Sequence, residues 1–417
     1  MGLKRLMFPP VVVAGGAGFR DVSMLRLPQL GSVIATSDPQ EPVRLVDASG
    51  AANECITDFM RHLVACDYSS ETCRSYAYSL LRWLRFLTAV EVAWQRAARI
   101  EVRDFVLWMK IAENPQRRRS KGSPPPGAVN PRTGKPDLGP GYAPATINHA
   151  LSAMRVFYDY HLITGLGPLV NPVPAQRGQD GARPLSHRSP MEVPQRLPRA
   201  AYRQRMPQRP PRALSDSVFA DFFAALGCSR DRAIIALGVG SGPRASELLR
   251  LRLEDLDIGR QVVALEGKGH HDREWVPVSP DALLWLACYL AETDQRRPPG
   301  DTRLWWTRRR PTRPLTYTAL RQVVARANEL LGTNVTFHDL RHTYAMRMMN
   351  DPKLLITDVQ RLMRHRSITS TQIYARAQID DLVAKMQEHY AQPRPAPARP
   401  ATGYDPAAMA VLFPDLA

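Results

Sequence analysis

One stretch of the sequence, residues 171–211, divides the chain into two parts. It is rich in proline and arginine, has few aliphatic side chains and shows no hydrophobic periodicity. Proline lacks a backbone donor and interrupts both helices and central strands, so such a stretch favours a linker over a packed element. Single hydrophobic cores rarely extend beyond roughly 250 to 300 residues. A chain of 417 residues with this break therefore predicts two domains.

Helical periodicity dominates the part before the linker, from residue 51 to 170. In residues 69–87, leucine and alanine recur every three or four positions, and Ser69 or Ser70 can cap the helix start. Residues 146–163 repeat the pattern. These segments predict an all-helical domain.

Several segments lack periodicity altogether. Residues 1–50 predict an irregular N-terminal arm, and the Pro-, Gly- and Arg-rich residues 113–144 predict a long exposed loop. Residues 391–417 form a tail rich in proline and alanine, in which 408–416 could dock as a short apolar segment.

The second domain, predicted at 212–390, is mainly helical with one small sheet. The expected helices are 215–226, 231–239, 244–251, 280–291, 316–331, 338–349 and 357–363. Two strand-like runs, 261–265 and 274–278, are separated by a segment containing Gly267 and Gly269. Glycine suits tight turns, so the two runs predict a β-hairpin.

The formal net charge of +17 indicates a polyanionic partner, because binding phosphates releases counterions. Charge alone leaves ribosomal and membrane-surface proteins open. No apolar run approaches the roughly 18 residues of a membrane span, and the five cysteines lack the spacing of a zinc site or a secreted disulfide scaffold. We therefore expect a cytoplasmic protein.

Four short motifs follow one another in the second domain. They are SGPRASELLRL at 241–251, EGKG at 266–269, FHDLRHTYA at 337–345, and 359–374 with His365 and Tyr374. In this order they resemble the boxes of tyrosine recombinases of the phage integrase kind, which read TGxRxSELxxL, a lysine-bearing hairpin, HxLRHTxA, and QxxLGH before a nucleophilic tyrosine. Each motif alone is weak, but four in order make chance matching remote.

The resemblance implies a two-domain DNA clamp, with an all-helical core-binding domain and a tyrosine recombinase catalytic domain. It assigns catalysis to Arg244, Lys268, His338, Arg341, His365 and Tyr374. Chemistry explains the arginines, since a guanidinium fork matches two phosphate oxygens and neutralises charge in the transition state. Glu247, three residues after Arg244, could hold that arginine in place. Lys268 resembles the general acid, and His365 would bind the scissile phosphate.

Tyr374 is the expected nucleophile, whereas Tyr390 and Tyr404 are not. An unperturbed tyrosine is roughly one part in a thousand phenolate at neutral pH, so the hydroxyl needs a base. The resemblance names His338 for that role. A phosphotyrosine bond conserves the energy of the broken phosphodiester, so no ATP, metal or other cofactor is expected.

Less specific interpretations exist for several of these residues. Arg244 could form only an exposed helical ion pair. His338 and His342 have the spacing of zinc ligands, but the sequence offers no HExxH and no evident third ligand. Trp305 and Trp306 are better explained by core packing than by base stacking.

Basic side chains outside the motifs are candidates for DNA contact. In residues 69–87, three arginines share one helix face, and another three are consecutive in the loop 113–144, where a solvated cluster and a phosphate contact are equally plausible. The candidates are Arg74, Arg82, Arg85, Arg117, Arg118, Arg119, His270 and Arg273.

Two positions depart from the family pattern. Arg364 stands where a glycine usually precedes the histidine, and glycine suits the left-handed turn that ends a helix. The orientation of the His365 side chain therefore depends on whether Arg364 can adopt that turn. Pro243 precedes Arg244, and proline is tolerated in a first helical turn.

The resemblance further implies four protomers acting on two double-stranded DNA sites, with a helix near 379–390 exchanged between neighbours. The expected task is integration, excision or transposition of a mobile element. Two rival interpretations are a catalytically inactive DNA-binding accessory protein on the same fold and a strand transferase resembling type IB topoisomerases. The DNA sequence that is recognised does not follow from composition.

Overall fold

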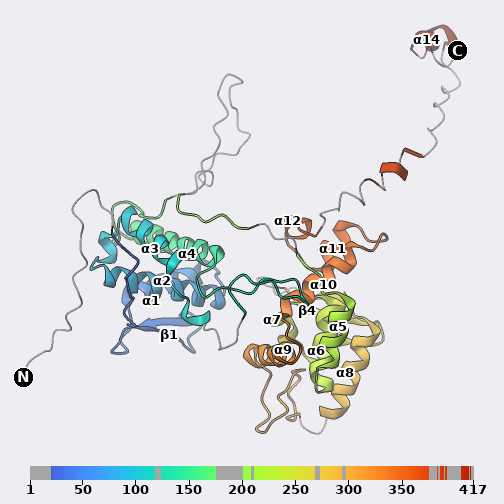
Figure 1. Ribbon diagram of the computed structural model, residues 1–417, viewed down its shortest axis with the longest axis horizontal. Coiled ribbons are helices and arrows are strands. Elements are labelled where there is room, and N and C mark those ends of the chain that lie inside the picture. Colours follow the sequence, from blue (N-terminus) through green and yellow to red (C-terminus); the bar gives the residue numbers. More distant parts are fainter. Residues whose placement is uncertain are drawn as a thin grey trace, which may run out of the picture. The chain divides into compact units, whose positions relative to one another are not determined.

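The computed structural model divides the chain into two compact units, Met1–Arg209 with Gly332–Asn334 and Pro210–Leu331 with Val335–Ala417 (Figure 1). It describes residues 20–117, 124–174, 201–207, 211–267, 273–293 and 297–374, and beyond these 383, 386–388, 390–391, 405–412 and 414. Each unit has its own hydrophobic core. Within these ranges, no helix combines the length and the apolarity that crossing a membrane requires.

Four helices form most of the first unit. They are α1 (Glu54–Ala65), α2 (Ser70–Ala89), α3 (Arg99–Ile111) and α4 (Pro144–Ile163), with 3-10 turns at Trp94–Arg96 and Pro115–Arg117. Helix α2 contacts the other three (Figure 1). The Ser69 side chain accepts a hydrogen bond from the backbone N–H of Thr72, as expected of a cap. The helices predicted at 69–87 and 146–163 are confirmed.

The first core is organised around two fully buried aromatic side chains, Trp83 of α2 and Tyr158 of α4. The indole N–H of Trp83 donates to the Tyr158 hydroxyl at 2.9 Å, and that hydroxyl donates to the Trp94 carbonyl at 3.0 Å. Because both polar groups are paired, they can be buried without a large desolvation cost. The pair fixes α4 against α2.

A β-hairpin within residues 32–46 corrects the prediction that residues 1–50 form an irregular arm. Strand β1 (Ser32–Ala35) pairs antiparallel with β2 (Val43–Val46), and the hairpin contacts α1 and α2. Val43 and Leu45 are buried against the helices. A two-residue period over only four residues is too short to stand out in a sequence, and packing against α2 stabilises the hairpin.

The second unit is mainly helical with a three-stranded sheet. Its helices are α5 (Asp216–Ala224), α6 (Ser229–Ser241), α7 (Ala245–Arg250), α8 (Pro280–Thr293), α9 (Tyr317–Leu331), α10 (Phe337–Met349), α11 (Ile356–Leu362), α12 (Thr369–Gln372) and α14 (Pro406–Leu412). The antiparallel sheet has the order β3 (Leu256–Asp257), β4 (Val262–Glu266), β5 (Arg273–Pro277). The hairpin β4–β5 is the predicted one, and β3 was not predicted.

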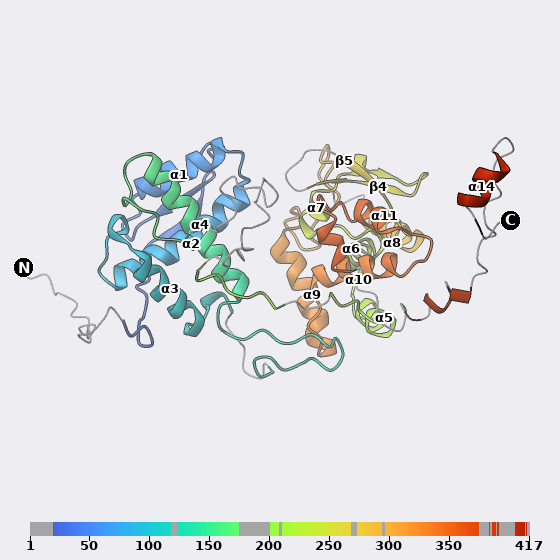
Figure 2. The same cartoon turned by 90° about the horizontal axis from the view of Figure 1, so that it is seen from above.

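Helices α6 and α10 lie at the centre of the second unit, with β4 and β5 at one edge (Figure 2). Helices α6 and α10 approach each other closely at Gly238 of α6, where a Cβ would lie 3.1 Å from Cδ1 of Leu340 in α10. Trp305 and Trp306 are buried, and the Trp305 indole donates to the Leu248 carbonyl at 2.8 Å, so their assignment to core packing is confirmed. This core holds α10 in place.

Candidate active site

Helix α10 carries three of the candidate side chains on one face. Its first turn is closed by a capping contact in which the Thr336 backbone N–H donates to Asp339 Oδ2 at 2.7 Å. His338, Arg341 and His342 follow at spacings of three and four residues, which place them on the same side of a helix. The local structure therefore presents a cation and two imidazoles together.

Arg341 is buried, with 3% of its surface exposed. Its guanidinium donates to the backbone carbonyls of Gly242 and Met363, which fixes its plane. Burial, reinforced by the positive charges of Arg244 and Arg364, lowers the pKa of Arg341 to about 10. The group remains protonated at neutral pH, so the site contains a buried, oriented cation.

A left-handed turn at Gly242 brings Arg244 to this site. Gly242 ends α6 with φ +59°, and a Cβ there would lie 2.4 Å from Tyr344 Cδ1, so only glycine fits. After Pro243 the chain enters α7 with Arg244 at the N-cap position. The Arg244 side chain is one-third exposed, in contrast to that of Arg341.

Glu247 links two arginines. Its carboxylate accepts from the backbone N–H of Arg244 at 2.8 Å, from the Arg244 guanidinium, and from Arg364 Nη2 at 2.9 Å. The contact predicted between Glu247 and Arg244 is therefore present. Burial alone would raise the pKa of Glu247, but Arg364 and Arg244 outweigh it and hold the pKa below its ordinary value. Glu247 is therefore ionised, and its carboxylate pairs with both Arg244 and Arg364.

Arg364 keeps the left-handed turn that the family pattern gives to glycine. Its φ is +51°, and the backbone N–H of His365 still bonds to the Gln360 carbonyl at 3.0 Å. The Arg364 guanidinium donates to the carbonyls of Leu362 at 2.9 Å and Gly242 at 3.2 Å besides Glu247. Sequence reasoning treated Arg364 only as a departure, and so missed a buried cation at the site.

His365 is held by a threonine that the sequence analysis did not single out. Its Nδ1 lies 2.9 Å from Thr371 Oγ1, and Thr371 is fully buried. Burial first, and then the charges of Arg341 and Arg244, lower the pKa of His365 to about 4. His365 is consequently neutral over the physiological range. A signal for Thr371 existed in its position one helical turn before Tyr374.

The Tyr374 hydroxyl contacts a histidine, but not the predicted one. It lies 2.7 Å from Nδ1 of His342, whereas the ring of His338 packs edge-on against the His342 ring at a centroid distance of 4.2 Å. Tyr374 is 7% exposed. Burial raises the pKa of Tyr374, and the charge of Arg341 offsets part of that rise. The resemblance names His338 as the base, whereas the histidine bonded to the Tyr374 hydroxyl in this structure is His342.

Some candidates fall elsewhere. Lys268, His270, Arg118, Arg119 and Tyr404 lie outside the described residues. Arg273 begins β5, is exposed and forms ion pairs with Glu254 and Asp255 at 3.4 and 3.2 Å. Tyr390 is exposed. Nowhere in the described part of the chain do three histidine, cysteine or acidic side chains gather in a way that could hold a metal ion.

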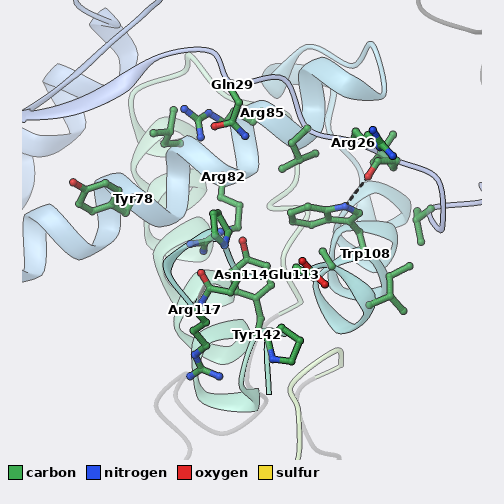
Figure 3. Close-up of a pocket in the computed structure, with 18 of the residues that line it drawn as sticks. Arg26, Gln29, Tyr78, Arg82, Arg85, Trp108, Glu113, Asn114, Arg117 and Tyr142 are labelled. Atoms are coloured by element: carbon green, nitrogen blue, oxygen red, sulfur yellow. Dashed lines mark hydrogen bonds between the residues drawn. The ribbon is translucent and has the colours of Figure 1, made fainter. Parts of the chain in front are cut away.

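A second candidate site is a cavity of about 1190 Å³ in the first unit, between residues 22–33, α2 and α3 (Figure 3). Arg82, Arg85 and Arg117 line it, together with Arg26, which the sequence analysis missed. Among its described lining residues, the only carboxylate is that of Glu113. The cavity is thus strongly basic, and three of the predicted DNA-contacting arginines meet there.

These arginines differ in what they contact. The Arg82 guanidinium lies 4.7 Å from the centroid of the Tyr142 ring. Arg85 donates to the carbonyls of Leu30 and Gly31 at 2.6 and 2.7 Å, and so fastens the N-terminal arm to α2. Arg117 donates to the Gly141 carbonyl at 3.1 Å. Arg74 does not line the cavity and is exposed beside Tyr78.

The sequence matches two family models. Residues 221–380 match the phage integrase family, and residues 56–120 match the N-terminal SAM-like domain of phage integrases. The chain is 31% identical over 255 residues to tyrosine recombinase XerC of Azotobacter vinelandii, covering 61% of this chain and 77% of that protein. It is 30% identical over 248 residues to tyrosine recombinase XerD of Lacticaseibacillus casei, covering 58% and 75%.

Solved structures show the same fold. The Tn1549 transposon integrase in complex with transposon right end DNA gives a TM-score of 0.53 at 17% identity, covering 81% of this chain and 99% of that one. The XerH site-specific recombinase bound to its difH substrate gives 0.50 at 15% identity, covering 80% and 84%. At such identities the likeness concerns the fold alone.

Proposed function

Because this chain belongs to the phage integrase family of tyrosine recombinases, we propose that it is a site-specific recombinase that cleaves and rejoins double-stranded DNA. The observation that carries the proposal is the buried hydroxyl of Tyr374 in a cluster containing the guanidinium of Arg341 and, through Glu247, that of Arg244. A phosphodiester bound in this cluster would meet one nucleophile and two fork-shaped cations.

Each residue has a defined part in the proposed cleavage. The oxygen of Tyr374 forms a bond to phosphorus while the bond from phosphorus to the 5′ oxygen breaks, which leaves a 3′-phosphotyrosine. Arg244 and Arg341 hold the non-bridging oxygens, whose negative charge grows in the transition state. Lys268 is the proposed donor of the proton that the 5′ oxygen takes up. The phosphotyrosine conserves bond energy, so rejoining proceeds without ATP.

His365 is the proposed hydrogen-bond donor to the scissile phosphate. A neutral imidazole carries one N–H, and when Nδ1 accepts from the Thr371 hydroxyl, that proton lies on Nε2. His365 can therefore donate to a phosphate oxygen without adding a positive charge. His338 is proposed to support the face of α10 that meets the phosphate.

The basic cavity of the first unit is the proposed contact with the DNA backbone. Arg26, Arg82 and Arg117 line it, and Glu113 is the one carboxylate among its described lining residues, so a phosphate there meets a surplus of positive charge. Arg85 supports this surface indirectly, because its guanidinium holds the N-terminal arm. DNA contact by this unit would add affinity that is independent of catalysis.

We further propose that the enzyme acts as a tetramer on two DNA sites, with a helix near 379–390 exchanged between protomers, in the integration, excision or transposition of a mobile element. The described part of the site retains both arginines and the tyrosine, which argues against an inactive accessory protein. A type IB topoisomerase would use the same chemistry without pairing two sites.

Recombination on a recovered target tests the proposal. Protein-bound DNA is sequenced from the native host, and two copies of the recovered site are placed on a supercoiled plasmid with EDTA and without ATP. We expect deletion or inversion between the sites, depending on their orientation, since strand exchange needs only the phosphotyrosine. Relaxation without site preference would instead indicate a topoisomerase, and binding without cleavage an accessory protein.

A further inference from the structure

One contact of the second unit has no role in the scheme so far, the one between Tyr374 and His342. We propose that His342 is the catalytic base that takes the proton of the Tyr374 hydroxyl, an assignment that rests on the proposed function and deepens it. The hydroxyl lies 2.7 Å from Nδ1 of His342, within the range for proton transfer.

The need for a base is greater here than at an exposed tyrosine. Only roughly one part in a thousand of an unperturbed tyrosine is ionised at neutral pH. The pKa of Tyr374 is raised further by burial, which Arg341 offsets only in part. A nearby cation alone therefore does not supply a phenolate, and a group that accepts the proton during attack is required.

The two histidines of α10 differ in what they contact. His338 and His342 share a face at i, i+4, but only His342 is bonded to the tyrosine. The His338 ring packs edge-on against His342, with an interplanar angle of 73°, and so limits the rotation of the accepting ring. His338 is thus a positioning residue for His342. The His365 ring lies parallel to the Tyr374 ring at a centroid distance of 6.4 Å, and its Nδ1 is engaged by Thr371.

The proton balance follows from the tautomer. With Nδ1 accepting, the ring proton of His342 lies on Nε2. As the bond from the Tyr374 oxygen to phosphorus forms, the O–H bond breaks and its proton moves to Nδ1, which gives an imidazolium. The bond from phosphorus to the 5′ oxygen breaks, and that oxygen takes a proton from Lys268. Rejoining reverses both transfers, and the imidazolium returns the proton to tyrosine.

Replacing His342 by asparagine separates basicity from hydrogen bonding. An asparagine side chain can place an amide atom near the position of Nδ1 and still accept from the hydroxyl, but it takes up no proton near neutral pH. We expect His342→Asn to slow single-turnover cleavage of a nicked DNA site by about a hundredfold or more, the scale of losing a general base. DNA affinity should be unchanged.

The dependence on pH gives the readout that a structural role would not move. Around His342 stand His338, Arg341, Tyr374 and His365. The wild-type rate should fall on acidification as the base is protonated, and His342→Asn should lose that step. The matched control, His338→Asn, removes an imidazole from the same helix face. Its cleavage rate should still fall on acidification as that of the wild type does. Imidazole added to His342→Ala should restore part of the rate.

Three results would overturn the assignment. The first is a His342→Asn cleavage rate within a few-fold of the wild-type rate. The second is loss of the pH dependence in His338→Asn and not in His342→Asn. The third is that imidazole does not restore the rate of His342→Ala while His342→Asn keeps the pH dependence. Thermal unfolding of each variant checks that it is folded, and the imidazole rescue remains decisive if asparagine disturbs packing. Adduct formation at Tyr374 is measured alongside. If the adduct forms there while His342→Asn is unimpaired, the base assignment fails and the proposed function stands.

Discussion

Replacing Arg341 by lysine is expected to slow DNA cleavage by roughly a hundredfold to a thousandfold, the scale of losing one oriented donor in a transition state. The guanidinium reaches two carbonyls, those of Gly242 and Met363, from a buried position. A lysine keeps the charge but has one rotating ammonium, which cannot reproduce the planar fork. The loss should therefore appear in the rate of the chemical step, measured under single turnover with DNA in excess of its dissociation constant.

Two further substitutions make this result specific. Arg244→Lys should slow DNA cleavage on the same scale, because the Arg244 guanidinium is the second proposed donor to the phosphate oxygens. Arg347→Lys is the matched control, since Arg347 lies on α10 but is partly exposed and bonded to Asp216 at 2.6 Å. It should cleave at nearly the wild-type rate. If all three lysine variants are equally active, bulk positive charge and not guanidinium geometry accelerates the reaction.

Replacing Glu247 by alanine is expected to destabilise the second unit by about 3 to 5 kcal/mol, the cost of leaving buried charge uncompensated. The Glu247 side chain is fully buried and bonded to Arg364, whose side chain is only 2% exposed. Without the carboxylate, Arg364 keeps its charge with carbonyl partners alone. Urea unfolding at neutral pH measures the loss. Glu254→Ala, which removes an exposed partner of Arg273, should change stability by less than about 1 kcal/mol.

A second substitution distinguishes charge from packing. Adding Arg364→Gly to Glu247→Ala removes the uncompensated cation and puts glycine at φ +51°, which it tolerates. The double variant should be more stable than Glu247→Ala alone. A double variant that is less stable would mean that the volume of Arg364, and not its charge, matters.

The same ion pair predicts a dependence on pH. The pKa of Glu247 is depressed in the folded protein, so the carboxylate contributes stability that is fully present above its unfolded value, about 4.3. That contribution is lost as the pH falls through the lower folded value. The stability difference between wild type and Glu247→Ala should therefore shrink on acidification through this window.

Local patterns predicted the fold where elements are long. Helix α2 is 20 residues long, so its apolar stripe and its Ser69 cap were visible in the sequence. The hairpin β1–β2 was missed because four-residue strands carry too little periodicity, and burial of Val43 and Leu45 against α2 determines it. Strand β3, with two residues, was missed for the same reason.

The candidate site was predicted in its residue types but not in its contacts. Three of the four motifs named Arg244, Arg341, His365 and Tyr374, which the structure brings together. The motif named His338 as the base, and only the tertiary contact between α10 and the segment after α11 shows that His342 bonds to Tyr374. The role of Arg364 depends likewise on a partner, Glu247, that is remote in sequence.

Covalent trapping on a nicked DNA site tests the central claim most directly. A nick just beyond the scissile phosphate lets the short 5′ fragment diffuse away, so the cleaved strand stays attached to the protein and survives denaturation. We predict that wild type forms this adduct, that digestion followed by mass spectrometry places it on Tyr374, and that Tyr374→Phe binds the DNA with equal affinity but forms none. An adduct that persists in Tyr374→Phe, or one that maps to the exposed Tyr390, would contradict the account.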